Sequence, residues 1–185
     1  MKYYKQYKED ISCDIPLVIR DRIKEFWDDV GGETVRSEGT FRPIVMFVGM
    51  APSKQDFELG IPFSDMPSQK LVGIISYISA GLEEPLADKV YKTFLCPELN
   101  DEDIELCKKR LEKEITLINP KCIVFIGESQ LFREHDSEES CVLKIGGKWY
   151  DSFTIPCLRE LFFKNEEVAK ITKEKLDSII NKLNE

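Results

Sequence analysis

The sequence predicts an α/β domain: a three-layer αβα sandwich in which helices cover both faces of a mainly parallel central sheet. Two short apolar runs, IVMFV at 44–48 and CIVFI at 122–126, are each followed directly by a glycine, as is typical of strands buried on both faces. Segments with helical periodicity alternate with these runs, which favours parallel strands joined by helices. The length of 185 residues fits one domain over 1–185 and is too short for two of ordinary size.

The other elements follow from apolar spacing and from the residues that start and end helices. Apolar positions near helical spacing predict helices before the paired Gly31 and Gly32, after Asn100, which we expect to act as a cap, and after Asn165, which precedes two acidic residues of a first turn. Two glycines, Gly146 and Gly147, separate short β-like runs and predict a hairpin. The expected order is helix 16–30, strand 44–48, helix 71–80, strand 90–95, helix 100–118, strand 122–126, strands 142–145 and 148–150, strand 153–155 and helix 165–183.

Composition narrows the class of protein. Apolar residues make up 42% and charged residues 32% of the chain, values that exclude a disordered or collagen-like chain. The first ten residues lack the apolar core of a secretory signal, and no stretch approaches the roughly 18 apolar residues of a membrane-spanning helix. Six cysteines occur without a CxxC pair. We therefore expect a cytoplasmic protein with no membrane partner, in a reducing compartment, with metal ligation left open.

The charge balance argues against broad, charge-driven nucleic-acid binding. The net charge is −8, whereas phosphate neutralisation requires clustered Lys and Arg. Basic residues do gather at Lys108, Lys109 and Arg110, but acidic residues are interleaved with them. A solvated helix face is the favoured interpretation of this cluster, and a phosphate site is the alternative.

The segment after the first buried strand is the clearest candidate for a ligand site. Residues 49–68, GMAPSKQDFELGIPFSDMPS, contain three prolines and two glycines, so we expect a long irregular loop. In open parallel sheets such loops, at the carboxyl ends of strands, bind ligands.

This segment, FVGMAPSKQDFELGIPF at 47–63, resembles the first motif of the uracil-DNA glycosylase superfamily, in particular its iron-sulfur family. The spacing from Gly49 to Gly60 to Phe63 fits the family pattern without a gap. Downstream, residues 96–127 are similar to the family's cysteine, helix, cysteine, Leu-Ile-x-Pro-Lys and strand-glycine sequence. The resemblance covers most of the chain at low identity and implies the fold of that superfamily.

The resemblance also implies an activity and a site. Such enzymes flip a nucleotide out of DNA and hydrolyse its N-glycosidic bond. The family's pattern implies that Phe63 stacks on the flipped base and that the loop backbone at Gly49, Met50 and Ala51 approaches it. Without the resemblance, Gly49 would only shape a tight loop and Phe63 would be a core residue.

Several positions depart from the family pattern. Met50 stands where the family has a glutamate, and the family's base-reading Asn has no counterpart near Lys92 or Thr93. We expect Asp56 or Asp65 to activate water or offset developing positive charge, a structural loop role being the alternative. Arg159 falls where the family has a late histidine and could contact a base carbonyl or a phosphate; the alternative is a surface arginine.

Three cysteines match the family's cluster ligands. They are Cys13, Cys96 and Cys107, and the resemblance implies that they bind a [4Fe-4S] cluster. The family's fourth cysteine is absent from the CDIPL segment at 13–17, although such clusters normally take four thiolates. Either another ligand completes the set, or the cluster has been lost and the cysteines are remnants.

Three functions follow as hypotheses. The first is a DNA glycosylase that removes uracil or another deaminated base, with DNA as its partner. The second is a catalytically inactive relative that binds nucleic acid, a nucleotide or a protein, which the altered polar positions and the acidic composition favour. The third, a small-molecule hydrolase, is supported by the fold class alone.

Overall fold

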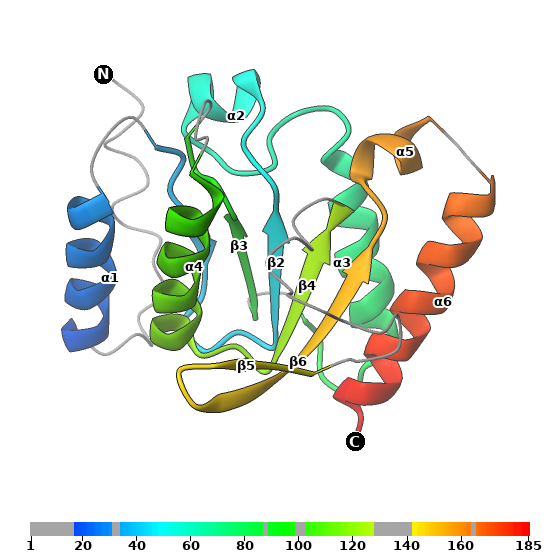
Figure 1. The fold of residues 1–185 in the computed structure, drawn as a ribbon. Coiled ribbons are helices and arrows are strands. Elements are labelled where there is room, and N and C mark those ends of the chain that lie inside the picture. Colours follow the sequence, from blue (N-terminus) through cyan, green and yellow to red (C-terminus); the bar gives the residue numbers. More distant parts are fainter. Residues whose placement is uncertain (1–16, 31–33, 87–88, 99–102, 128–141, 164–165) are drawn as a thin grey trace.

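The computed structural model describes residues 17–30, 34–86, 89–98, 103–127, 142–163 and 166–185. These residues form one mixed sheet flanked by helices (Figure 1). In chain order the elements are α1 (Leu17–Val30), β1 (Glu38–Gly39), β2 (Val45–Gly49), α2 (Lys54–Leu59), α3 (Gln69–Gly81), β3 (Val90–Phe94), α4 (Ile104–Ile118), β4 (Cys122–Ile126), β5 (Val142–Ile145), β6 (Lys148–Ile155), α5 (Leu158–Phe162) and α6 (Glu166–Leu183).

The sheet is mainly parallel, as predicted. Its order is β1-β3-β2-β4-β6-β5. The four central strands pair in parallel, and β1 and β5 pair antiparallel at the two edges. Every residue of β2 and β4 is buried, which explains why both read as uninterrupted apolar runs.

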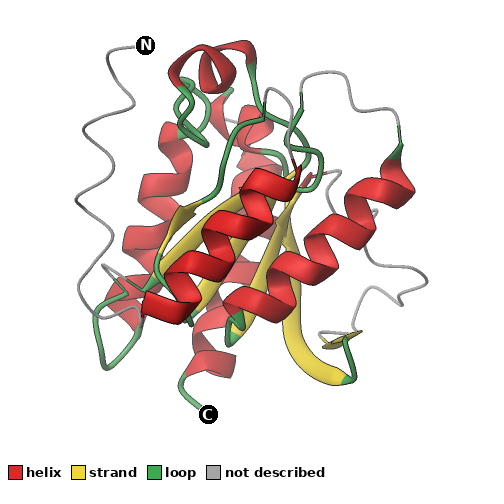
Figure 2. Ribbon diagram, turned by 90° about the vertical axis from the view of Figure 1, so that its left-hand side faces the viewer, coloured by secondary structure: helices red, strands yellow, loops and turns green. Residues whose placement is uncertain are grey.

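Helices cover both faces of the sheet and complete the three layers of the predicted sandwich (Figures 1 and 2). On one face, α1 and α4 pack over a core that contains Met46 of β2 and Leu111 of α4. On the other, α3, α5 and α6 enclose a second core around Phe47 and Val124. Neighbouring residues of one strand thus pack into opposite cores, because successive side chains of a strand point to opposite faces of the sheet.

Two predictions were wrong: the irregular loop expected before α3, and the two separate strands expected after residue 147. The loop predicted at 49–68 contains α2, a six-residue helix closed by caps at both ends; it is too short to create an apolar periodicity. The two strands predicted at 148–150 and 153–155 are one strand, β6. Its first half pairs with β5 and its second half with β4, and the buried polar Ser152 interrupts the apolar pattern between them.

The start of α4 and the segment before α6 also differ from the prediction. Asp103 caps α4 by accepting a hydrogen bond from Leu106 N at 3.0 Å, whereas Asn100 lies outside the described residues. The short helix α5, which carries Arg159, was not predicted. Within the described ranges, no helix combines the length and the apolar character needed to cross a membrane.

Candidate functional site

Phe63, Phe94 and Gly49 pack together at the carboxyl ends of β2 and β3. The rings of Phe63 and Phe94 are stacked, with centroids 4.7 Å apart and an interplanar angle of 25°. A Cβ atom on Gly49 would lie 2.8 Å from Phe94 Cδ1 and 2.9 Å from Phe63 Cζ. Gly49 therefore has no room for a side chain, because both rings lie against its backbone. The structure brings together two predicted site residues, Gly49 and Phe63, with an aromatic partner that the sequence reasoning missed.

Phe63 has an unusual backbone conformation for its residue type. Its φ is +58°, in the left-handed region, which costs a side-chain-bearing residue about 1–3 kcal/mol and is common at functional sites. The ring is half-buried and packs on the core beneath α3. Such a conformation persists only where the neighbouring residues hold it.

Asp56 holds the residue that follows Phe63. Its carboxylate is 2% exposed and accepts from Ser53 N and Ser53 Oγ, each at 2.8 Å, through Oδ2. Its Oδ1 accepts from Ser64 N and, at 2.8 Å, from Ser64 Oγ. The Ser64 carbonyl in turn accepts from Gln55 Nε2 at 3.0 Å. The buried carboxylate thus ties the start of α2 to the backbone beside Phe63.

Asp65 is placed differently from Asp56. It is only partly buried, and its Oδ1 accepts from Ser68 N at 3.1 Å just before α3. One hydrogen bond leaves a carboxylate with further accepting capacity. Of the two acidic residues predicted for the site, Asp65 is therefore the one whose carboxylate is open to solvent and to a ligand.

Met50 and Ala51 continue the chain from β2 towards α2. The Met50 carbonyl accepts from Cys96 N at 2.8 Å, and its side chain packs on the core beneath α4. Ala51 is exposed. Among the described residues, no backbone carbonyl accepts a hydrogen bond from the N–H of Met50 or Ala51.

Arg159 lies on α5, which follows β6 at the same end of the sheet as α2 (Figure 1). The residue is exposed. Cys157, immediately before α5, packs on the other strand-ending glycine, Gly127, where an added Cβ atom would lie 3.2 Å from Cys157 Cβ. Arg159 thus lies at the same end of the sheet as α2, and its role at the site stays a prediction.

The cysteines offer an incomplete ligand set for a cluster. Cys96 and Cys107 are each 2% exposed and belong to the same apolar cluster beneath α4. Cys13 lies outside the described residues. Among the residues that are described, no group of three or more His, Cys, Asp or Glu could hold a metal ion. The described residues thus supply two thiols, where a [4Fe-4S] cluster normally takes four.

A buried polar network joins α4 to β3. Arg110 Nη1 donates to Glu114 Oε2 at 2.7 Å, and these residues are 9% and 1% exposed. Tyr91 OH and Thr93 Oγ1 donate to the same carboxylate at 2.9 and 3.0 Å. Burial and the neighbouring Glu114 charge raise the pKa of Tyr91 well above its usual 10.0. The predicted solvated face at 108–110 is thus wrong for Arg110.

The network had a signal in the sequence. Arg110 and Glu114 are spaced i, i+4 and fall within the stripe that also contains Cys107, Leu111 and Ile118. A helix residue in an apolar stripe points to the core whatever its charge. The hydrogen bonds that Asp56 accepts from Ser53 and Ser64 also had a signal in the sequence, because Ser53 and Asp56 have the spacing of a capping box.

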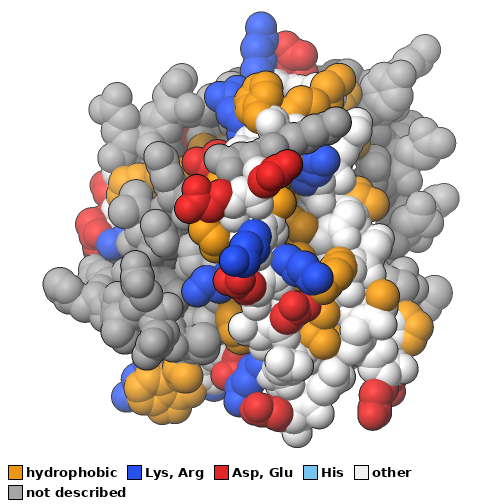
Figure 3. All heavy atoms as spheres, turned by 90° about the vertical axis from the view of Figure 1, so that its right-hand side faces the viewer, with side chains coloured by type: hydrophobic (Ala, Val, Ile, Leu, Met, Phe, Trp, Pro, Cys, Tyr) orange, Lys and Arg blue, Asp and Glu red, His pale blue; other side chains and the backbone are white. Residues whose placement is uncertain are grey.

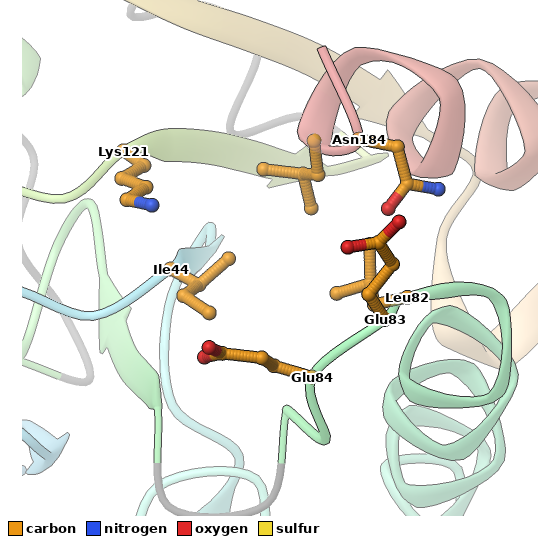
Figure 4. A pocket seen from close by; sticks show the side chains of 7 residues that line it. Ile44, Leu82, Glu83, Glu84, Lys121 and Asn184 are labelled. Atoms are coloured by element: carbon orange, nitrogen blue, oxygen red, sulfur yellow. The ribbon is translucent and has the colours of Figure 1, made fainter.

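A separate cavity lies at the opposite end of the sheet, where the central strands begin. Its volume is about 200 Å³, and its walls include Ile44, Glu84 and Lys121 (Figure 4). Ile44 precedes β2 and Lys121 precedes β4, so the cavity faces the amino ends of the strands. None of the predicted site residues lines it.

The surface over α3, α5 and α6 carries charges of both signs. In Figure 3, the Lys and Arg side chains of this face are interspersed with Asp and Glu. Exposed apolar side chains lie among the described residues as well; the largest exposed fractions belong to Phe163 at 73% and Val72 at 66%. The described residues of this face therefore form no single-sign basic patch of the kind expected of charge-driven DNA binding (Figure 3).

Comparison with known proteins finds one family model and two relatives. The family described as the Uracil DNA glycosylase superfamily matches residues 37–179. A Type-4 uracil-DNA glycosylase of Sulfurisphaera tokodaii is 32% identical over 126 residues, and one of Saccharolobus solfataricus is 29% identical over 126 residues. Each match covers 63% of this chain and 56% of the relative, so the chain spans little more than half the length of these relatives.

Proposed function

Because the chain belongs to the Uracil DNA glycosylase superfamily, we propose that it removes uracil or another deaminated base from DNA by hydrolysing the N-glycosidic bond. The observation that carries the proposal is the strained, half-buried Phe63 beside Gly49 at the carboxyl ends of the central strands. A base extruded from the helix stacks well on an aromatic ring, whatever its sequence context. The matched relatives, named as uracil-DNA glycosylases, support the same reaction.

The residues around Phe63 have distinct roles in this proposal. The N–H groups of Met50 and Ala51 donate to the carbonyl oxygens of the extruded base, since backbone donors need no particular side chain. Arg159, exposed on α5 at the same edge, contacts a base carbonyl or a phosphate with its permanent charge. Stacking, backbone donors and one cation together bind a base that is rich in acceptors, as uracil, hypoxanthine and xanthine are.

Bond cleavage requires a water and a compensating charge. The bond between the base nitrogen and the sugar C1′ breaks, the electron pair leaves with the base, and a water oxygen attaches to C1′. In this proposal the Asp65 carboxylate orients that water, accepts its proton and offsets the developing positive charge on the sugar. Asp56, whose two oxygens are occupied by Ser53 and Ser64, instead positions Phe63.

Excision assays with matched variants test this function. The substrates are single-stranded and paired oligonucleotides that carry uracil, hypoxanthine or xanthine, and cleavage after alkali reports the abasic product. Phe63→Ala is expected to lower the rate about 10- to 100-fold, the range of one base–aromatic stack. Trp149→Ala is the control, because Trp149 is 63% exposed in the β5–β6 hairpin, away from the site. An unchanged rate in Phe63→Ala would exclude stacking on this ring.

Asp65→Asn separates the proposed chemistry from a structural role of the loop. The asparagine oxygen can still accept from Ser68 N, so the loop is preserved while the charge and the basic oxygen are lost. We expect base binding to persist and the excision rate to fall by about 10²- to 10⁴-fold, on the order of a general base's contribution. Asp65→Asn activity equal to wild type would remove Asp65 from the reaction.

A binding function without catalysis is the second candidate. Met50 supplies no carboxylate at the family's glutamate position, and Phe94 covers one face of the Phe63 ring. If well-folded protein cleaves none of the substrates, binding of the same oligonucleotides, free nucleotides and proteins is the next measurement. An iron-sulfur cluster on Cys13, Cys96 and Cys107 is a separate proposal, tested by the visible absorption of anaerobically purified protein.

A further inference from the structure

Arg110 connects the buried network to the end of β3. Its Nη2 donates to the carbonyl oxygens of Phe94 and, at 3.1 Å, of Leu95. Phe94 is the last residue of β3 and the stacking partner of Phe63. One guanidinium thus binds the two carbonyls on either side of the point where the strand ends.

These carbonyls belong to peptides that are tied to β2. Leu95 N donates to the Gly49 carbonyl at 2.8 Å, and Cys96 N donates to the Met50 carbonyl at 2.8 Å. Gly49 is the residue on which both aromatic rings pack. A contiguous set of hydrogen bonds therefore runs from Arg110, through the end of β3, to the backbone of the candidate site.

The guanidinium is itself held on several sides. Glu114 accepts from Nη1, and the carboxylate is fixed by hydrogen bonds from Tyr91, Thr93 and Ser37. Trp27 of α1 lies against Arg110, whose guanidinium carbon is 5.3 Å from the ring centroid. Groups from separate segments thus fix the orientation of one side chain.

A buried ion pair is poor evidence of stabilisation, because the desolvation of two charges offsets their attraction. A well-packed apolar pair of similar volume would often stabilise the protein equally. An apolar side chain cannot, however, donate to the Phe94 and Leu95 carbonyls, which are the bonds that distinguish Arg110 here.

We propose that Arg110 is a positioning residue for the Phe63 site, with Glu114 as the group that orients it. By holding the last peptides of β3, Arg110 fixes Phe94 and the Gly49–Met50 backbone on which Phe63 packs. It touches neither base nor sugar. The inference rests on the proposed function only for its consequence for excision; the structural part can be tested without it.

Amide hydrogen exchange, measured by NMR on the full chain, tests the structural part. Arg110→Lys keeps a positive charge beside Glu114 but has one nitrogen where arginine has three, so it cannot span the carboxylate and both carbonyls. We expect exchange at the Leu95 and Cys96 amides to accelerate at least 10-fold, and exchange in β4 and β6 to change much less. Equal acceleration throughout the sheet, or none at Leu95 and Cys96, would overturn the proposal.

Two further variants separate positioning from stability. Ile118→Val, at a fully buried position of the same helix, should lower the melting temperature while keeping the hydrogen bonds from Arg110 to the Phe94 and Leu95 carbonyls, and should leave the two amides protected. Arg110→Met combined with Glu114→Leu removes both charges together. If this double variant is as stable as the wild type and its Leu95 and Cys96 amides exchange fast, the result supports a positioning role for Arg110. If the two amides stay protected, the result overturns the proposal. If the double variant does not fold, Arg110→Lys and Ile118→Val decide.

Excision kinetics then test the consequence. For each substrate that the wild type cleaves, Arg110→Lys should lower kcat/KM at least 10-fold, while Ile118→Val at equal folded fraction should not. Wild-type rates in Arg110→Lys, despite fast exchange, would overturn the link to the site. If the wild type cleaves nothing, the proposed function fails, and the exchange data alone decide whether Arg110 holds the end of β3.

Discussion

The two glycines that end the central strands look alike in sequence but are required for different reasons. Gly49 and Gly127 each come at the end of a fully buried apolar run. A side chain on Gly49 would collide with two aromatic rings, at 2.8 and 2.9 Å. Gly127 has a φ of +60°, and its nearest neighbour would be Cys157 Cβ at 3.2 Å. One glycine makes room for a site, and the other allows the chain to turn.

Gly49→Ala should have the largest effect, because the new methyl group must displace Phe63, Phe94 or both. Overpacking of this kind costs up to about 3 kcal/mol of unfolding free energy, and excision should fall with it because Phe63 moves. Urea unfolding and the excision assay measure the two effects. Adding Phe94→Leu makes room and should recover part of the stability. A Gly49→Ala protein with wild-type stability would show that the rings adjust freely.

Asp56→Ala comes next and tests what holds Phe63. It leaves the donors of Ser53 and Ser64 without their buried acceptor and removes the capping box of α2, at a cost of about 2 kcal/mol. We expect excision to fall more than the folded fraction does. Glu58→Gln is the control: among the described residues, the Glu58 carboxylate forms an exposed pair with Lys54 at 3.7 Å, worth less than about 0.5 kcal/mol. If both variants lowered excision equally, the hydrogen bonds of Asp56 would not be what positions Phe63.

These contrasts also explain what the sequence could and could not predict. The buried strands and the Phe63 segment were predictable because their signal lies in consecutive residues. Phe94, 31 positions after Phe63 in the chain, became part of the site only through the parallel pairing of β2 with β3. A pairing between distant strands leaves no mark in either segment.

The charged stretch around Arg110 was misread for a related reason. Charge alone favoured solvent, and burial of Arg110 depends on acceptors from other segments, at Phe94, Leu95 and the residues that fix Glu114. Local composition cannot reveal whether such partners exist. The helical stripe, rather than the charge, held the correct information about which way this side chain points.

The buried network of Arg110, Glu114 and Tyr91 should also affect how the free energy of unfolding depends on pH. Because the pKa of Tyr91 is raised in the folded protein, the unfolded chain loses this proton first as the pH rises above 10.0. Its contribution to stability is therefore present below that pH and is lost above it, by up to about 1.4 kcal/mol per pH unit. Tyr91→Phe should remove one proton's share of this slope, measured by urea unfolding between about pH 9 and 11. An unchanged slope would place the Tyr91 hydroxyl in water.

Gly127→Ala should have the smallest effect and closes the comparison. An alanine in the left-handed region costs about 1–2 kcal/mol, and the methyl group would press only on Cys157. We expect a modest loss of unfolding free energy, and excision unchanged at equal folded fraction, because no ring of the candidate site is displaced. Removing the neighbour's Cβ should not help, since the cost lies in the backbone: in a Cys157→Gly background, Gly127→Ala should lower the unfolding free energy as much as it does in the wild type. A smaller loss in that background, like the recovery expected at Gly49, would mean that both glycines make room for side chains and that the strand-glycine signature has a single cause.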